Sequence, residues 1–158
     1  ILYGRMGIIS WGIDMDPDMI EFAEKRRARL RQANTFFQRG RATALPFKAA
    51  SFDHASISMG LHEKEESCRD RIISEMRRVV KKDGALVIVD YRVPYPQDAY
   101  GYAAKAVEKM AGKTHFRYFE DFLRDGGLDS LLRRHHLHEE ERDYPRRMPL
   151  VLLKVRNA

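Results

Sequence analysis

Short apolar runs alternate with amphipathic stretches along most of this chain. The run Ile8–Ile13 is uncharged and rich in β-branched and aromatic residues, which predicts a buried strand that ends at Asp14. From Pro17 to about Gln32, apolar side chains recur at helical spacing among arginines and lysines. This pattern predicts a helix whose buried stripe consists of Met19, Ile20, Phe22, Ala23 and Leu30.

The alternation continues through the middle of the chain. Short strands are predicted at Thr35–Gln38 and Phe52–Ser58, the second being less apolar than the others. Apolar residues at helical spacing predict an amphipathic helix over Ser67–Lys82 that stops at Asp83–Gly84. The run Ala85–Val89 is the most strand-like in the chain, and its composition is typical of a central parallel strand.

Helices and then two consecutive strands are predicted for the remaining residues. Apolar residues repeat every three or four positions from Ala99 to Met110, a short helix is predicted at Tyr118–Phe122, and leucines at 128, 131 and 132 line another. Strands follow at His138–Tyr144 and Leu150–Val155. The order of elements predicts an α/β fold with an antiparallel strand pair at its end.

Length and composition narrow the class of protein. The 158 residues suit one domain, so we expect 1–158 to form a single domain. The net charge is +6, but most basic residues alternate with acids on predicted helices, so nucleic-acid binding is not required. No apolar run is long enough for a membrane helix. The single Cys68 cannot form an internal disulfide, and we expect a cytoplasmic protein.

Asp14 is the first residue whose position suggests chemistry. It ends a predicted strand, and Asp16 with Pro17 then begins a helix. A carboxylate at the carboxyl end of a parallel strand can accept hydrogen bonds from both hydroxyls of a ribose. The alternative is that Asp14 only helps to cap the next helix.

The first residues are too few for the element that should precede this strand. A doubly wound sheet needs an earlier strand, a glycine loop and a helix, and only Ile1–Tyr3 and Gly4–Gly7 stand here. We therefore expect residues with a glycine-rich loop to be absent, so that the N-terminal part of the domain is incomplete. Either Ile1–Tyr3 is a remnant of that earlier strand, or the true N-terminus was removed. In the first case, a chain break wider than the ~3.8 Å between bonded Cα atoms is expected between Ile1 and Gly7.

Five short motifs follow one another with a family-like order and spacing. They are Gly12–Ile20, Gly40–Phe47, Ser51–Asp53, Ser58–His62 and Arg78–Leu86. Together they resemble the class I S-adenosylmethionine (SAM)-dependent methyltransferases. The likeness is greatest to the small-molecule branch of ubiquinone and menaquinone biosynthesis enzymes (methyltransferase type 11), and it covers roughly residues 8–92.

The resemblance implies a fold and an activity. The fold is a Rossmann-like, doubly wound, mostly parallel sheet whose last strand is antiparallel. The activity is transfer of a methyl group from SAM to an O, N or C nucleophile of a small, aromatic or apolar molecule. A non-catalytic binding module with the same fold and an NAD-dependent oxidoreductase are the alternatives. Nothing in the sequence indicates an oligomeric state.

The resemblance also implies which residues contact the adenosine. Asp14 would bind the ribose, Met15 would lie against the adenine, and Arg41 and Ala42 would lie at the adenine edge. Most relatives carry an acid at the position of Arg41, where it accepts from the adenine amino group. An arginine has no acceptor, so this position favours an altered contact or the non-catalytic alternative.

Five further residues are site candidates, two toward the cofactor and three toward the acceptor. The resemblance places Ser58 and Met59 beside the methionine half of the cofactor. His62 follows them and has a suitable intrinsic pKa for a general base, although a surface histidine is an equal reading. Asp90 and Tyr91 end the strongest predicted strand, where open α/β sheets carry their site residues. Their alternative role is a cap or loop contact.

The chain also contains an aromatic-rich region and a short histidine tract. An aromatic-rich region follows that strand, and in relatives it helps to form a lid over the acceptor; core packing is the alternative, which we favour for Tyr102 and Phe119. Its members are Tyr95, Tyr100, Tyr102, His115, Phe116, Tyr118 and Phe119. The second group is His135, His136 and His138, which has no second ligand cluster at a familiar spacing, so we expect no metal site.

Overall fold

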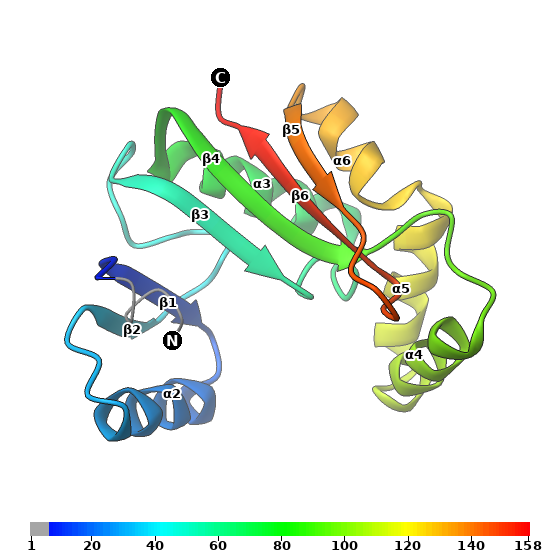
Figure 1. Ribbon diagram of the computed structural model, residues 1–158, viewed down its shortest axis with the longest axis horizontal. Helices are drawn as coiled ribbons and strands as arrows, with labels where there is room; N and C mark the ends of the chain where they lie inside the picture. The colour runs from blue at the N-terminus through cyan, green and yellow to red at the C-terminus, as the bar shows by residue number, and fades with distance from the viewer. Residues whose placement is uncertain (1–6) are drawn as a thin grey trace. The chain divides into compact units, whose positions relative to one another are not determined.

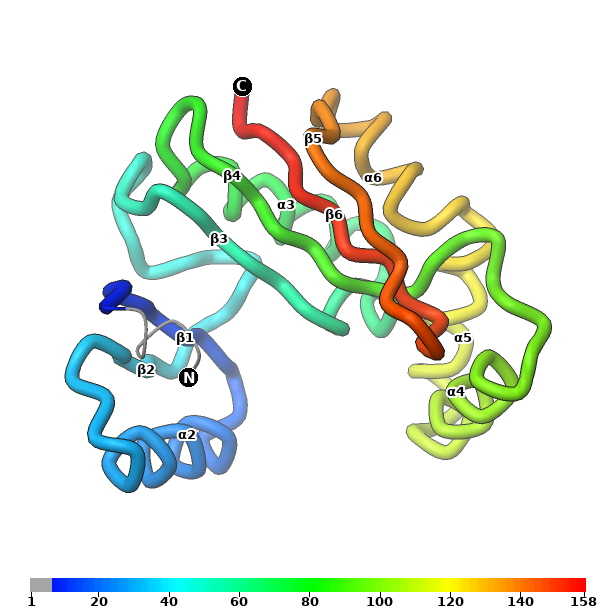
Figure 2. The backbone as a smooth tube through the Cα atoms, in the orientation of Figure 1, coloured from blue at the N-terminus to red at the C-terminus, as the bar shows by residue number. Residues whose placement is uncertain are grey.

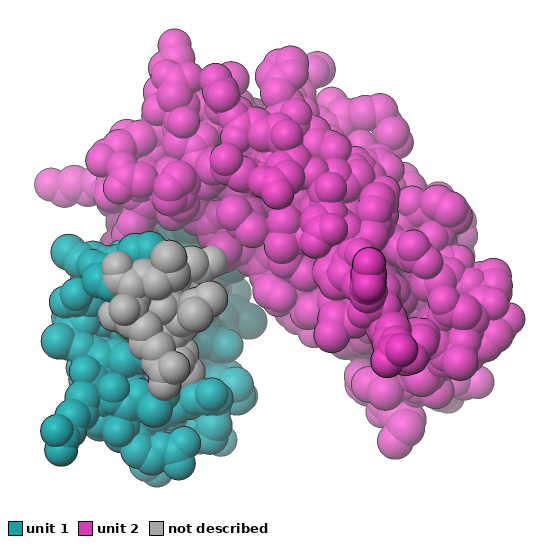
Figure 3. Space-filling view, in the orientation of Figure 1, with its two compact units in different colours: residues 1–46 teal, residues 47–158 magenta. Residues whose placement is uncertain are grey.

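A computed structural model of the chain describes residues 7–158. The chain divides into two compact units, Ile1–Pro46 and Phe47–Ala158, which are coloured separately in Figure 3. We call them the first and second units. The chain break expected between Ile1 and Gly7, and the strand expected at Ile1–Tyr3, fall outside the described residues.

The first unit contains two parallel strands joined by a helix (Figure 1). Strand β1 (Ser10–Asp14) pairs with β2 (Thr35–Arg39), and Asp14 lies opposite Arg39 in the register. Helix α2 (Pro17–Arg29) begins where predicted, because the Asp16 side chain accepts a hydrogen bond from the Asp18 amide and a proline stands in the first turn.

The apolar residues of the first unit are more exposed than their pattern predicts. No residue of α2 is fully buried, and Met19 and Phe22 expose 51% and 58% of their surface. In β1, Trp11 is 43% exposed. The predicted buried strand and buried helical stripe are therefore wrong in this respect. The physical reason is size: two strands and one helix offer too little surface to cover both faces of each element.

The second unit is built on a four-stranded sheet in the order β3-β4-β6-β5. Strand β3 (Phe52–Ser58) is parallel to β4 (Val80–Tyr91), while β6 (Leu150–Arg156) is antiparallel to both β4 and β5 (His138–Asp143). The α/β class and the antiparallel last strand are confirmed.

One part of the sheet prediction is wrong. We expected the strand of Asp14 and the strand Ala85–Val89 to share a sheet, but β1 pairs with β2 alone while β4 belongs to the four-stranded sheet. No strand pairing joins these two sheets among residues 7–158. The strand expected to stand beside β1 would have come from Ile1–Tyr3, which are not described.

Two helices lie over one face of the four-stranded sheet. They are α3 (Glu66–Val79) and α6 (Gly127–Arg134), whose courses are seen in Figure 2. Helix α3 buries Ile72, Met76 and Val79, and α6 buries its three leucines. Alternate residues of β4 and β6 face this layer, so Leu86 and Leu153 are fully buried. This layer is the core of the second unit.

Helix α3 ends earlier than predicted, and the following strand begins at once. Helical structure stops at Val79, and β4 already includes the residues expected to end the helix. Asp83 adopts φ +63°, and a Cβ on Gly84 would lie 2.5 Å from the Asp53 carbonyl oxygen. Asp83–Gly84 thus marks a bend inside a strand and not a helix stop.

Helices α4 (Ala99–Met110) and α5 (Lys113–Arg124) follow the carboxyl end of β4 and pack against each other (Figure 1). Phe119 is fully buried, which confirms its core role. Tyr102 is 61% exposed, so the core role expected for it is wrong. Tyr102 lies on the outward side of α4, where periodicity alone does not reveal that a helix face is unpacked. Across residues 7–158, no helix combines the length and apolarity needed to cross a bilayer.

We predict that Leu153→Ala lowers the free energy of unfolding by about 2–5 kcal/mol, because it removes a fully buried side chain from β6 and leaves a cavity. Leu152→Ala is the matched control, since Leu152 is the same residue type on the half-buried face of the same strand. Urea unfolding followed by circular dichroism measures both. Equal losses would contradict the assignment of the core to the face of Leu153.

Candidate functional site

A buried carboxylate lies at the end of β4. Asp90 is fully buried, and its two oxygens accept four hydrogen bonds. Three come from the backbone amides of Leu61, His62 and Tyr91, at 3.0, 3.3 and 2.8 Å. The fourth partner is Nδ1 of the His62 ring, at 2.7 Å. This set of donors fixes both the loop after β3 and the orientation of the imidazole.

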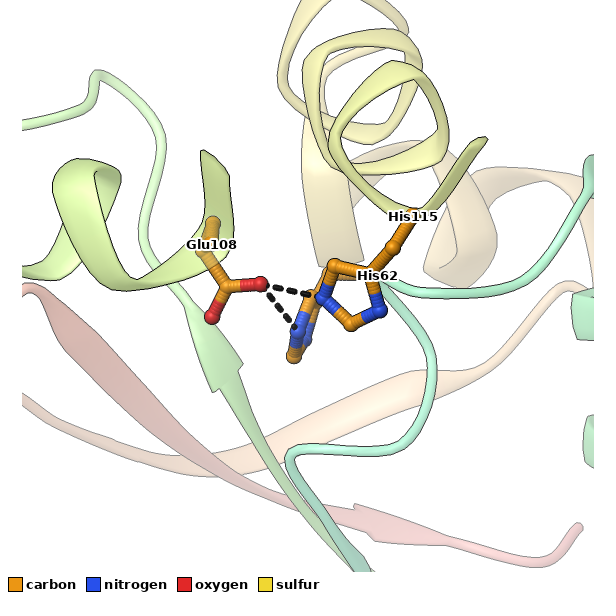
Figure 4. Close-up of side chains that lie close together, drawn as sticks. All are labelled: His62, Glu108 and His115. Carbon is orange, nitrogen blue, oxygen red and sulfur yellow. Dashed lines mark hydrogen bonds and ion pairs between the residues drawn. The ribbon is translucent and has the colours of Figure 1, made fainter. Parts of the chain in front are cut away.

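The other side of the His62 ring meets a second carboxylate. Its Nε2 lies 3.4 Å from Oε2 of Glu108 on α4, and the same oxygen contacts Nε2 of His115 on α5 (Figure 4). The Tyr91 hydroxyl donates to Oε1 of Glu108 at 2.6 Å. We call His62, Asp90, Tyr91, Glu108 and His115 the polar cluster.

The carboxylates of the polar cluster shift the ionisation of its members. Burial alone would lower the pKa of His62, but the hydrogen bond to Asp90 and the negative charges of Asp90 and Glu108 raise it above the ordinary value. Burial would raise the pKa of Glu108, but hydrogen bonds from Tyr91 and His115 lower it. The cluster therefore favours a protonated His62 beside an ionised Glu108.

Aromatic rings surround the polar cluster. The rings of Tyr91 and Phe119 pack edge-to-face on His62, with centroids 4.8 and 6.2 Å away. Tyr95 packs on Tyr91 at 5.8 Å. Burial, together with neighbouring carboxylates, raises the pKa of Tyr91 far above its ordinary value and that of Tyr95 to about 12. Both phenols therefore remain protonated hydrogen-bond donors at neutral pH.

The chain reaches His62 through a turn with a strained residue. Met59 follows β3 with φ +55°, a conformation that costs energy in a residue with a side chain, and its amide donates to the Val89 carbonyl at 2.8 Å. Arg69, which is only 2% exposed, donates to the carbonyl of Leu61 and to that of Tyr118 on α5. The loop with His62 is thus fixed from both sides.

In the first unit, the residues expected to contact the adenosine lie at or just after the carboxyl ends of β1 and β2. Asp14 is exposed at the carboxyl end of β1, where its Oδ1 accepts from the Asp16 amide at 2.9 Å. Met15 beside it is 51% exposed. The Arg39 guanidinium donates to the Met15 carbonyl at 3.0 Å, and the Gly40 amide donates to the Asp14 carbonyl. These bonds hold the backbone at the end of β1.

Arg41 and Ala42 lie in a tight turn that follows β2. The Ala44 amide donates to the Arg41 carbonyl at 3.1 Å, and the two residues form an isolated bridge. The Arg41 side chain is exposed. Because β1 and β2 are parallel and adjacent, this turn leaves the same edge of the sheet as Asp14.

The structure gathers some of the expected residues and separates others. His62, Asp90 and Tyr91, expected on separate grounds, form one hydrogen-bonded group in the second unit. The expected cofactor residues are divided, because Asp14, Met15, Arg41 and Ala42 belong to the first unit whereas Ser58 and Met59 belong to the second. The histidine tract does not gather: His135 contacts Asp70, whereas His136 and His138 are exposed.

Two residues of the polar cluster carry no signal in the sequence that identifies them. Glu108 is one of three charged residues in α4, and its pairing with His62 depends on a contact between residues 46 positions apart. In the sequence, His115 stands out only as part of the aromatic-rich region. Glu108 is the only acidic residue in α4, but acids on helices are usually exposed, so this does not by itself suggest burial.

Comparison with known proteins identifies a family. The model of a family described as methyltransferase domain matches residues 3–84. The demethylmenaquinone methyltransferase of Shouchella clausii is 25% identical over 114 residues, which cover 70% of this chain and 48% of that protein. The ubiquinone/menaquinone biosynthesis C-methyltransferase UbiE of Citrifermentans bemidjiense is 33% identical over 106 residues, covering 64% and 44%. The chain thus spans about half the length of the curated relatives that it matches.

A solved structure supports the fold. A SAM-dependent methyltransferase from Methanosarcina mazei superposes with a TM-score of 0.67 at 18% identity, and the match covers 98% of this chain and 84% of that one. At this identity the likeness shows the fold alone.

We predict that Asp90→Asn lowers the free energy of unfolding by about 3 kcal/mol, because its amide nitrogen cannot accept from the N–H groups that face it and a buried charge pair is lost. Asp143→Asn is the matched control, since Asp143 is exposed at the end of β5 in the same sheet. Thermal and urea unfolding measure the difference. A loss no larger than that of the control would contradict the central role of the Asp90 carboxylate.

Proposed function

The chain belongs to the methyltransferase domain family, and from this premise we propose that it transfers the methyl group of SAM to a small molecule. The observation that carries the proposal is the carboxyl edge of β1, where an exposed carboxylate stands next to an exposed apolar side chain. Asp14 and Met15 supply this pair. The segment that the family model matches includes both residues.

The groups at the carboxyl end of β1 are of the kinds that bind an adenosine. The Asp14 carboxylate can accept hydrogen bonds from the two ribose hydroxyls, and the Met15 side chain offers an apolar surface for the adenine ring. The bonds from Arg39 to the Met15 carbonyl and from the Gly40 amide to the Asp14 carbonyl hold this backbone in place before any ligand binds. Such preorganisation reduces the entropy lost on binding.

Arg41 changes the recognition of the adenine. Its exposed guanidinium can stack on the ring but cannot accept from the adenine amino group. We infer that the backbone of Ala42 in the adjoining turn reads a ring nitrogen, as the resemblance implies. Adenine recognition would then depend on backbone and stacking and not on a carboxylate.

Residues of the second unit are proposed for the reacting half of the cofactor. Ser58 is exposed at the carboxyl end of β3, and Met59 adopts its strained left-handed conformation immediately after it. Strained residues of this kind cluster at ligand sites, where the surrounding structure stabilises them. Ser58 and Met59 would border the methionine end of SAM.

The acceptor is proposed to be a small aromatic molecule with a hydroxyl group. The matched relatives are named for menaquinone and ubiquinone biosynthesis. In this chain, the half-buried Tyr95 packs on Tyr91 near the end of β4, and an accessible ring of this kind favours an aromatic guest. The polar cluster supplies groups that can engage a hydroxyl oxygen beside the ring.

The proposed roles in the polar cluster differ among its residues. Asp90 is a positioning residue, since it contacts the His62 ring and three backbone amides. His62 presents Nε2 on the side away from Asp90 and, with Glu108, would engage the acceptor hydroxyl. Tyr91 orients Glu108 through its hydroxyl. SAM supplies an electrophilic methyl group, and these residues would align the acceptor and exclude water around it.

We predict that the full-length protein transfers labelled methyl from SAM to hydroxylated aromatic acceptors, and that it binds S-adenosylhomocysteine but not NAD. The assay measures transfer to a panel of quinols and phenols, and calorimetry measures binding of the two nucleotides. Binding of S-adenosylhomocysteine without transfer to any acceptor would favour a non-catalytic module. Selective binding of NAD would contradict the proposal.

We predict that Asp14→Ala weakens S-adenosylhomocysteine binding by roughly a hundredfold or more, because hydrogen bonds to a charged group contribute about 1.5–3 kcal/mol each. Unfolding should change little, since Asp14 is exposed. Asp18→Ala is the matched control, as Asp18 is an exposed acid in the first turn of α2. Calorimetry measures the affinity of each variant for S-adenosylhomocysteine. An unchanged affinity in Asp14→Ala would refute the contact between Asp14 and the ribose.

A further inference from the structure

We propose that His62, Glu108 and His115 bind a divalent transition-metal ion such as Zn²⁺. The three residues come from the loop after β3, from α4 and from α5, and their side chains converge in Figure 4. One donor atom from each lies within 4.8 Å of the others. Glu108 Oε2 and His62 Nε2 are 3.4 Å apart, which is about the separation of two ligands that share one ion at bonds of ~2.1 Å.

Neighbouring residues orient these ligands as they do in metal centres. Asp90 holds Nδ1 of His62, which leaves Nε2 for the ion. The Tyr91 hydroxyl occupies Oε1 of Glu108, which leaves Oε2. Glu63 Oε2 lies 3.7 Å from Nδ1 of His115. Each ligand thus has an outer partner on the atom that does not face the ion.

The charges of the site favour a cation. Asp90 and Glu108 are both buried, and the half-buried Glu63 lies beside His115. Buried carboxylates are stable only when paired or bound to a metal. A divalent ion would replace the Glu108–His115 hydrogen bond and compensate the carboxylates together.

The ligand types indicate the class of metal. Two imidazoles and one carboxylate suit Zn²⁺ or Fe²⁺ and not Mg²⁺ or Ca²⁺, which prefer oxygen. Three protein ligands leave a coordination position for a further oxygen. If the proposed function holds, that oxygen is the hydroxyl of the acceptor. The His115 side chain is 24% exposed, compared with 3% for His62, so an ion would enter from the His115 side.

The metal alone is the probe for the test. The full-length protein, freed of metal with a chelator, is titrated with Co²⁺ and then Zn²⁺. We expect visible absorption of one bound Co²⁺ per chain, with its loss when Zn²⁺ is added. In Glu108→Gln and His115→Gln the affinity should fall by about tenfold or more. His115→Gln is the safer variant, since its side chain is partly exposed.

His135→Gln is the matched control, because His135 also contacts a carboxylate but lies outside the polar cluster. It should keep the absorption of the unchanged protein. Absence of stoichiometric Co²⁺ or Zn²⁺ in the folded protein would overturn the proposal, as would binding by His115→Gln and Glu108→Gln that is as tight as that of the unchanged protein. Asp14→Ala should keep the metal and lose S-adenosylhomocysteine, so failure of the metal site and failure of the proposed function give different results.

Discussion

The carboxylate of Asp90 is the constraint on which the candidate acceptor site depends. A buried negative charge is tolerated only when hydrogen-bond donors surround it, and here three backbone amides and an imidazole do so. Two of the amides, those of Leu61 and His62, belong to the loop after β3, whereas Asp90 itself ends β4. The carboxylate therefore ties the ends of two neighbouring strands together and sets the position of His62.

The rest of the polar cluster follows from that fixed imidazole. Glu108 of α4 meets Nε2 of His62, and its hydrogen-bond donor Tyr91 lies next to Asp90 in the chain. Arg69 reinforces the arrangement by joining Leu61 to Tyr118 of α5. Buried polar contacts thus hold helices α4 and α5 to the loop after β3 and to the end of β4. Such contacts require a specific geometry.

The two units differ in how their candidate residues are held. At the end of β1, Asp14 and Met15 are placed by local structure: a strand end, an Asp16 cap and a parallel neighbour. The polar cluster instead draws on residues from His62 to His115, and none of its contacts is local to one element except that of Tyr91 with Asp90. Residues placed by local contacts do not need a large core, so the small first unit can position them. The polar cluster is formed by distant residues, and it therefore depends on the packed core of the second unit.

The sequence by itself determined the α/β class, the antiparallel last strand, the family resemblance and the candidates Asp14, His62, Asp90 and Tyr91. It could do so because strand periodicity, helix capping and strand ends are read from neighbouring residues. It did not reveal the exposure of Met19 and Phe22, the division of the strands into two sheets, or the partnership of Glu108 and His115 with His62. Only the tertiary structure decided these, because burial and charge pairing depend on which distant elements meet, and no local pattern encodes that contact.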